Sequence, residues 1–177
     1  MRRTRRLTRT VALLVLVGAA GSFLYLFYLD VHDTRLEIDW RVHLYIFNAI
    51  TGQNVTIPAG IGVAGANLWY NHTWDAWGPP GYAPLSTRDN TGTIYIQSVA
   101  PQVFVLGNFF DIWGQVLNQT CVGFGTGSYC GGNGNPDPFL SNGSSEYCLQ
   151  WYTPLDNGKT WIIVFGRPSP EPPTCYG

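Results

Sequence analysis

The sequence lacks the short motifs that mark common enzyme sites. It contains no Gly-x-Ser-x-Gly, no His-Glu-x-x-His and no phosphate-binding glycine loop, and only three histidines occur in 177 residues. These absences argue against the usual hydrolases, metalloproteases and nucleotide-binding proteins. We therefore expect a protein that is not an enzyme and that needs no cofactor.

Charge is unevenly distributed along the chain. No acidic residue occurs in the first 29 positions, no charged residue occurs in 11–29, and five of the ten basic residues precede that run. A helix over residues 11–29 would be about 28 Å long, close to the ~30 Å hydrocarbon core of a bilayer. The pattern predicts a basic cytoplasmic stub, residues 1–10, followed by a transmembrane signal-anchor helix, residues 11–29.

One alternative to this anchor stays open. Small residues at 18–22 would suit a signal peptidase, and cleavage near Gly21 would give a secreted protein. The apolar run continues to Leu29, which favours an uncleaved helix. We expect a single-pass cell-membrane protein with an extracytoplasmic domain.

The part of the chain from Asp30 onward is acidic. It carries five basic and eleven acidic residues, a net charge of −6. Such a balance disfavours binding to nucleic acid or to an anionic membrane surface. The expected partners are the membrane, through the N-terminal helix, and an envelope protein, a glycan or a second copy of the chain.

The cysteines and the glycosylation sequons agree with export. The cysteines are Cys121, Cys130, Cys148 and Cys175, and the Asn-x-Ser/Thr sequons are at Asn54, Asn71, Asn118 and Asn142. Four cysteines outside the cytoplasm favour two disulfides, for which we expect Cys121–Cys130 and Cys148–Cys175 among the three connectivities. A zinc site is disfavoured because there is no Cys-x-x-Cys and no nearby histidine. The sequons predict a glycoprotein surface.

Helical periodicity is nearly absent after residue 30. Alternating or β-rich segments at 35–47, 54–57, 92–98, 102–106, 147–152 and 160–165 predict short strands, separated by turns. The apolar spacing of residues 108–117 predicts one helical turn with Asn108 as its cap. Residues 118–145 are predicted to form a surface loop that is held by a disulfide. We expect an all-β antiparallel sandwich or open barrel over residues 30–166, followed by a Pro-rich tail, residues 167–177.

Aromatic residues are concentrated in a long loop over residues 60–84. Trp69, Tyr70, Trp74, Trp77 and Tyr82 all lie there. They would either pack the loop against the sheet or form a platform for a carbohydrate or another ligand.

Two segments resemble a family of exported archaeal and bacterial β-domains. They are L-S-T-R-D-N-T-G-T-I-Y-I-Q at 85–97 and F-V-L-G-N-F-F-D-I-W-G at 104–114. The family pairs an L-H-T-H-D-x-x-G-x-I-H-I-E stretch with F-x-L-G-x-F-F-D-I-W-G. Within the second motif, Phe109, Phe110 and Trp113 are expected to plug one end of the core, and Asp111 to be a polar partner of the backbone or a first-turn acid.

The chain departs from the histidines of this family. Ser86, Arg88 and Tyr95 stand where the family has histidine, and Gln97 stands where it has an acid. Only two candidate ligands for a metal remain, which are His43 and Asp89. The resemblance implies that this chain keeps the fold of the family but has lost its metal site.

These patterns favour a non-catalytic, membrane-anchored β-domain with a cell-envelope, adhesion or assembly role. A copper-type metal-binding domain with a degenerate histidine site is one alternative. A filament subunit that donates residues 36–46 as a strand to the next copy is another.

Overall fold

The computed structural model describes residues 18–25, 35–125 and 127–167. The chain divides into two compact units, residues 1–35 and 36–177. In the first unit, residues 18–25 are helical, and the Ser22 hydroxyl donates to the Gly18 carbonyl at 2.9 Å. No helix among the described residues combines the length and apolar character needed to span a bilayer. The predicted anchor lies largely outside the described residues and stays a prediction.

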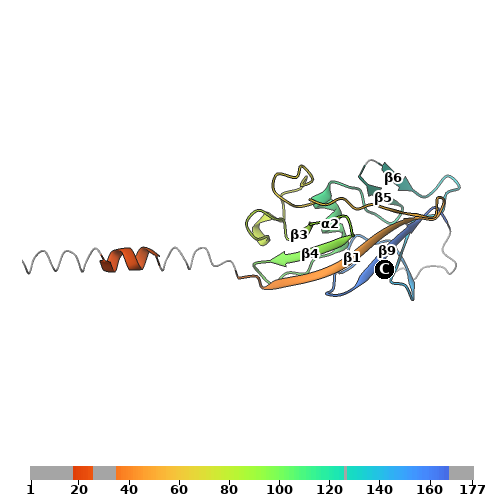
Figure 1. Ribbon diagram of the computed structural model, residues 1–177. Coiled ribbons are helices and arrows are strands. Elements are labelled where there is room, and N and C mark those ends of the chain that lie inside the picture. The colour runs from red at the N-terminus through yellow and green to blue at the C-terminus, as the bar shows by residue number, and fades with distance from the viewer. Residues whose placement is uncertain (1–17, 26–34, 126, 168–177) are drawn as a thin grey trace, which may run out of the picture. The chain divides into compact units, whose positions relative to one another are not determined.

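The second unit is mostly β and contains a mixed seven-stranded sheet (Figure 1). The strands are β1 (Ile38–Asn48), β2 (Gln53–Val55), β3 (Leu85–Thr87), β4 (Thr93–Ser98), β7 (Phe139–Ser141), β8 (Glu146–Cys148) and β9 (Thr160–Phe165). Their order is β3-β4-β1-β9-β7-β8, and β2 pairs with the C-terminal end of β1.

One strand pair corrects the prediction of a wholly antiparallel sheet. β1 and β9 are parallel, whereas the other strand pairs of the described sheet are antiparallel. Parallel neighbours need a long crossover connection, and the whole chain between Asn48 and Thr160 supplies it. Strand-forming patterns in the sequence do not specify which strands become neighbours.

The central strand, β1, follows the predicted two-residue alternation. Val42, Leu44 and Ile46 are fully buried, while Asp39 and Arg41 are exposed. β1 pairs with β4 and β2 along one edge and with β9 along the other. Donation of residues 36–46 to a second copy would therefore remove the central strand of the sheet.

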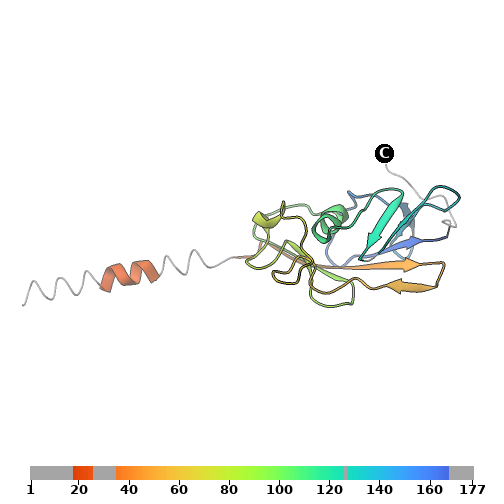
Figure 2. The same cartoon turned by 90° about the horizontal axis from the view of Figure 1, so that it is seen from above.

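A helix and a small hairpin cover one face of the sheet. They are α2 (Leu106–Trp113) and the hairpin of β5 (Cys121–Phe124) with β6 (Gly127–Cys130). Figure 2 shows both on the same side of the sheet. The rings of Phe109, Phe110 and Trp113 are buried and lie 5.7–5.9 Å apart, centroid to centroid. From the hairpin, Phe124 stacks on Phe165 of β9 at 5.2 Å.

The start of α2 differs from its predicted position. The helix begins at Leu106, so Asn108 is the third helical residue and not the cap, and Asp111 is not in the first turn. Asn108 still contributes to capping, because its Oδ1 accepts the Val105 N–H at 2.9 Å. Gly114 ends the helix in the left-handed conformation, with φ +74°.

The predicted strand over 102–106 does not form. The N–H groups of Leu106 and Gly107 donate to the carbonyls of Thr153 and Trp151 at 2.8 and 2.7 Å. These bonds satisfy two N–H groups that a helix leaves unpaired at its start. The partner of β4 in its hairpin is therefore β3.

Two further segments are shorter or more ordered than predicted. β8 ends at Cys148, because residues 150–153 turn to meet α2 instead of continuing the predicted strand over 147–152. The segment predicted as one loop, 118–145, contains β5, β6 and β7. The 60–84 segment is a loop as predicted, with one 3-10 turn, η1 (Asp75–Trp77).

Candidate functional site

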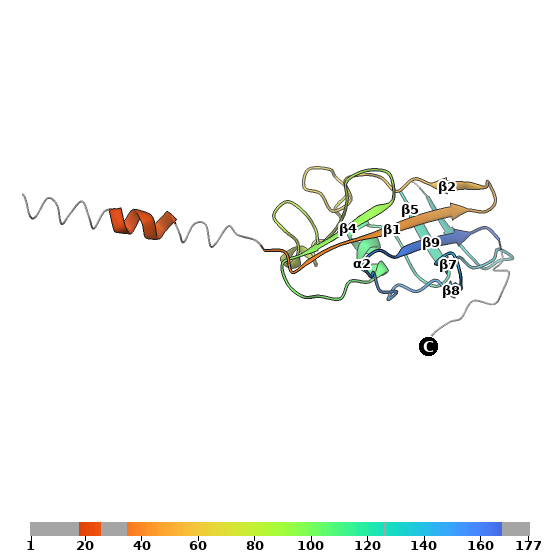
Figure 3. The same cartoon turned by 60° about the horizontal axis from the view of Figure 1, so that its bottom comes forward.

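The face of the sheet opposite α2 carries the candidate site, which we call the open face. Alternation along the strands places on it Asp39, Arg41, His43, Tyr45 and Phe47 from β1, Tyr95 and Gln97 from β4, and Ile162 and Val164 from β9. Figure 3 shows β4, β1, β9 and β7 side by side, with α2 and β5 behind them. Because the described helix and hairpin pack against the other face, these side chains border solvent, except for Val164, which is buried.

Four residues form what we call the Arg–Tyr row: Arg41, Tyr95, Arg88 and Tyr82. The Cζ of Arg88 lies over the Tyr95 ring at 4.3 Å and the Cζ of Arg41 over the same ring at 5.2 Å. Arg88 also lies over the Tyr82 ring at 5.5 Å. Stacking on aromatic faces restrains both guanidinium groups without neutralising their charge.

Gln97 of β4 connects the row to Asp39 of β1. Arg88 Nη2 donates to Gln97 Oε1 at 2.6 Å, and Gln97 Nε2 donates to Asp39 Oδ1 at 3.1 Å. In the described part of the chain, neither Arg41 nor Arg88 has a carboxylate oxygen within 4.0 Å of a guanidinium nitrogen. The two cations can therefore bind an added carboxylate or phosphate.

The positions that depart from the family motif lie close together. Ser86 and Tyr95 are partners across β3 and β4, and Arg41 is the partner of Tyr95 on β1. Ser86 is 1% exposed, and its Oγ has no hydrogen-bond partner among the described residues. A hydroxyl at this depth is not presented to a substrate in solution.

His43 and Asp89 are linked through two threonines. His43 Nδ1 lies 3.2 Å from Thr93 Oγ1, which lies 2.8 Å from Thr91 Oγ1, and the Thr91 hydroxyl donates to Asp89. Hydrogen bonds from the Thr91 hydroxyl and N–H hold the pKa of Asp89 below its usual value. Among the described residues, no three His, Cys, Asp or Glu side chains lie close enough together to hold a metal ion.

The other end of the open face is apolar. A shallow hollow of about 400 Å³ is lined by Tyr45, Phe47, Asn54, Ser141, Glu146, Ile162, Val164 and Arg167. Arg167 lies 3.7 Å from Glu146 and over the ring of Phe139 at 5.3 Å. The open face thus combines a cationic end with an apolar end.

The five aromatic residues of the 60–84 loop do not form one platform. Trp69, Trp74 and Trp77 are half-buried and pack against the core. Tyr70 is 65% exposed and Tyr82 belongs to the Arg–Tyr row. Trp69 also lines a hollow of about 380 Å³ together with His72 and Asp75, which are hydrogen-bonded at 2.8 Å.

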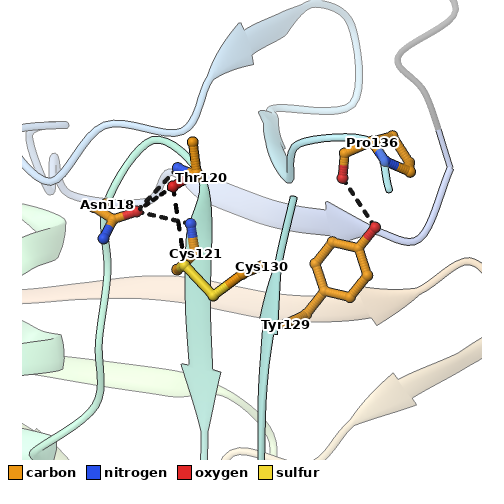
Figure 4. Close-up of a disulfide and its surroundings, with 6 residues drawn as sticks. All are labelled: Asn118, Thr120, Cys121, Tyr129, Cys130 and Pro136. Atoms are coloured by element: carbon orange, nitrogen blue, oxygen red, sulfur yellow. Dashed lines mark hydrogen bonds between the residues drawn. A yellow bond between two sulfur atoms is a disulfide. The ribbon is translucent and has the colours of Figure 1, made fainter. Parts of the chain in front are cut away.

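A disulfide fixes the β5–β6 hairpin (Figure 4). It joins Cys121 and Cys130, which face each other across the two strands, and this confirms the predicted pair. Cys148 is also disulfide-bonded. Its predicted partner, Cys175, lies outside the described residues, so the second pairing stays a prediction.

The four sequons lie in different surroundings. Asn54, Asn118 and Asn142 are exposed, and Asn71 is half-buried. Asn54 is on β2, whereas the other three are in turns in which the asparagine Oδ1 accepts backbone N–H groups. Exposure makes three of these asparagines accessible to a modifying enzyme.

Two features of the surface were not predicted from the sequence. The first is Arg41, whose place in the Arg–Tyr row follows from the alternation along β1 once β4 is known as its neighbour. The second is an exposed aromatic pair, Trp151 and Tyr152, which the sequence predicts as part of a strand. No local signal distinguishes these two residues from buried aromatics.

Comparison with known proteins finds no match to a family model, a curated protein or a solved structure. The resemblance of the 85–97 and 104–114 motifs to exported β-domains therefore stays a prediction.

Proposed function

We propose that this chain is a non-catalytic, membrane-anchored protein that displays its β-domain outside the cytoplasm. Residues 11–29 would be the anchor, with the arginine-rich stub inside the cell. The Cys121–Cys130 disulfide supports this location, since structural disulfides persist in oxidising compartments. In this proposal the β-domain is sandwich-like, with α2 and the β5–β6 hairpin as the second layer.

The domain would act in the cell envelope by binding an anionic partner on its open face. The observation that carries this proposal is the Arg–Tyr row, in which Arg41 and Arg88 share the Tyr95 ring and have no carboxylate partner among the described side chains. Because the domain is acidic overall, its net charge does not attract anions. Binding would depend instead on the fixed positions of the two restrained arginines.

The partner that fits best is a carboxylate-bearing polymer or protein segment. A guanidinium binds a carboxylate through two parallel N–H···O bonds, and prior stacking reduces the entropy lost when it does so. The apolar hollow at the other end of the open face would contact the less charged part of the same partner.

The test uses the full chain in detergent and beads coated with polygalacturonate, a carboxylate polymer, or with neutral dextran. Wild type should bind the first and not the second. The double variant Arg41→Gln/Arg88→Gln should bind polygalacturonate at least about tenfold more weakly, which corresponds to about 1.4 kcal/mol.

The matched control removes the same charge elsewhere. Arg35→Gln/Lys159→Gln also lowers the net charge by two but leaves both the Arg–Tyr row and the lining of the apolar hollow intact. It should keep most of the affinity. Equal losses in the two double variants would mean that only net charge matters, and would refute the proposed binding surface.

A further inference from the structure

A separate hollow lies away from the open face, beside the disulfide hairpin. Its volume is about 380 Å³, and it is lined by Asn118, Gln119, Thr120, Gln150, Trp151 and Tyr152. No charged residue is among them. Trp151 is 56% exposed and Tyr152 is 42% exposed, with their rings at 87° to each other and 6.0 Å apart. Aromatic rings beside amide and hydroxyl groups suit an uncharged, partly apolar ligand such as a sugar ring.

The aromatic wall of this hollow is held in place by α2. The Gly107 N–H donates to the Trp151 carbonyl at 2.7 Å, and the Leu106 N–H donates to the Thr153 carbonyl. A Cβ on Gly107 would lie 2.8 Å from the Trp151 carbonyl oxygen and 3.1 Å from its ring, so glycine is what allows Trp151 to pack there. The Trp151 ring is therefore both exposed and restrained, and a ligand would bind it at a low cost in entropy.

The opposite wall is an equally restrained sequon. The Oδ1 of Asn118 accepts the N–H groups of Thr120 and Cys121 at 2.9 and 2.7 Å and the Thr120 hydroxyl at 3.1 Å. Figure 4 shows the Asn118 Nδ2 directed away from this turn. A bond to Nδ2 would leave all three hydrogen bonds intact.

We propose that Asn118 carries an N-linked glycan whose first sugar ring packs against Trp151 and Tyr152. The inference rests on the proposed extracytoplasmic location. The donor would be a lipid-linked sugar pyrophosphate, used by a membrane glycosyltransferase of the same cell. The Asn118 Nδ2 bonds to the anomeric carbon, the bond from that carbon to the phosphate oxygen breaks, the lipid pyrophosphate leaves with the electron pair, and one Nδ2 proton passes to a base.

The other sequons lack this arrangement. Asn142 Nδ2 already donates to the Tyr147 hydroxyl at 3.3 Å, and Asn71 is half-buried. Asn54 lies on β2, beside the apolar hollow of the open face. The hollow beside Asn54 also contains aromatic rings, but the charged Glu146 and Arg167 line it, whereas no charged residue lines the hollow beside Asn118. Asn118 is thus the exposed sequon that lies beside an uncharged aromatic surface.

The first experiment is mass spectrometry of peptides from the full chain, purified from the membranes of its native cells. The peptide that contains Asn118 should carry the added mass of a glycan. Thr120→Ala should remove that mass, whereas Thr120→Ser, which preserves the sequon, should keep it. An unmodified Asn118 in the native protein overturns the inference.

The second experiment separates packing of the sugar from its mere attachment. Trp151→Ala should lower the melting temperature of the glycosylated chain by roughly 2–4 °C more than it does in the same chain made without glycosylation, a background that leaves Thr120 in the lining of the hollow. Tyr152→Ala should show the same dependence, to a smaller extent. Equal shifts in both backgrounds mean that the ring does not contact the sugar, and overturn the inference.

Two other results distinguish this inference from the proposed function. If Asn118 is bare while protease treatment of intact cells still removes the β-domain, only the glycan inference fails. If that treatment does not reach the β-domain, the proposed location itself fails.

A different result would assign the hollow to a free sugar. If the unglycosylated chain binds free N-acetylglucosamine and Trp151→Ala abolishes this binding, the hollow binds sugar from solution and the attached glycan is not its occupant.

Discussion

The guanidinium of Arg88 lies 4.3 Å from the centre of the Tyr95 ring, at the position where the sheet presents its open face. The same ring also contacts Arg41 at 5.2 Å. One aromatic side chain of β4 thus positions two cations, Arg41 on β1 and Arg88 directly after β3. The proposed binding surface consequently depends on Tyr95 as much as on either arginine.

Two substitutions of Tyr95 should distinguish the contribution of its ring from that of its hydroxyl group. Exposed cation–π contacts contribute about 0.5–1 kcal/mol each, so Tyr95→Leu should lower the free energy of unfolding by about 1–2 kcal/mol. It should also reduce binding to polygalacturonate. Tyr95→Phe retains the ring and should preserve both quantities. Urea titration and the bead assay measure the two effects, and a loss in the phenylalanine variant equal to that in the leucine variant would contradict the role of the ring.

Trp113 should be among the most costly residues to truncate. It is 1% exposed and packs on Phe109 and Phe110, so Trp113→Ala should cost about 3–5 kcal/mol. Val103, which is 75% exposed, provides the control, and Val103→Ala should change stability by less than about 0.5 kcal/mol. Thermal unfolding measures both. Unchanged stability of Trp113→Ala together with loss of a ligand would instead make the 104–114 motif a recognition surface.

Gly92 shows where the backbone tolerates no side chain. Its φ is +81°, and a Cβ would collide with the Leu44 carbonyl oxygen on β1. Gly52 has a similar φ of +69° but open space around it. Gly52→Ala should therefore cost about 1 kcal/mol from backbone strain alone, and Gly92→Ala at least about 2 kcal/mol more. Equal unfolding free energies for the two variants would show that the β1–β4 contact can relax.

Asp89 should contribute to stability only where it is ionised. Its pKa is lowered in the folded protein by the hydrogen bonds from Thr91, so the contribution is complete above the pKa of the unfolded chain. It is lost as the pH falls through the lower, folded pKa. Melting curves of wild type and Asp89→Asn should therefore differ at pH 6 and converge in strong acid. A difference that grows toward low pH would contradict this assignment.

The sequence predicts local structure here better than it predicts neighbours. The alternation of residues 35–47 is sufficient to predict β1, and Phe109, Phe110 and Trp113 have helical spacing. Val103 to Leu106 has β-strand composition, yet the contact that decides its structure is with carbonyls near Trp151. A contact over that separation has no signature in a local window of sequence.

The same limit applies to the candidate site. Tyr95 and Gln97 share one face because they alternate along the predicted strand over 92–98. Arg88 joins them because β3, a strand that the sequence pattern does not predict, pairs with β4. The addition of Arg41 requires knowing that β1 is the next strand, and the pairing of Trp151 with the Asn118 turn requires the tertiary fold. The sequence shows which polar and charged side chains are present, but which of them lie together depends on the order of the strands in the sheet.

The β-domain is proposed to lie outside the cytoplasm on an uncleaved anchor. Protease treatment of intact cells, followed by detection of a tag on the N-terminus, tests it most directly. The full-length band should disappear, and a small, membrane-bound, tagged fragment containing residues 1–29 should survive. A full-length band that persists until the cells are lysed would place the domain inside the cell and contradict the proposed location.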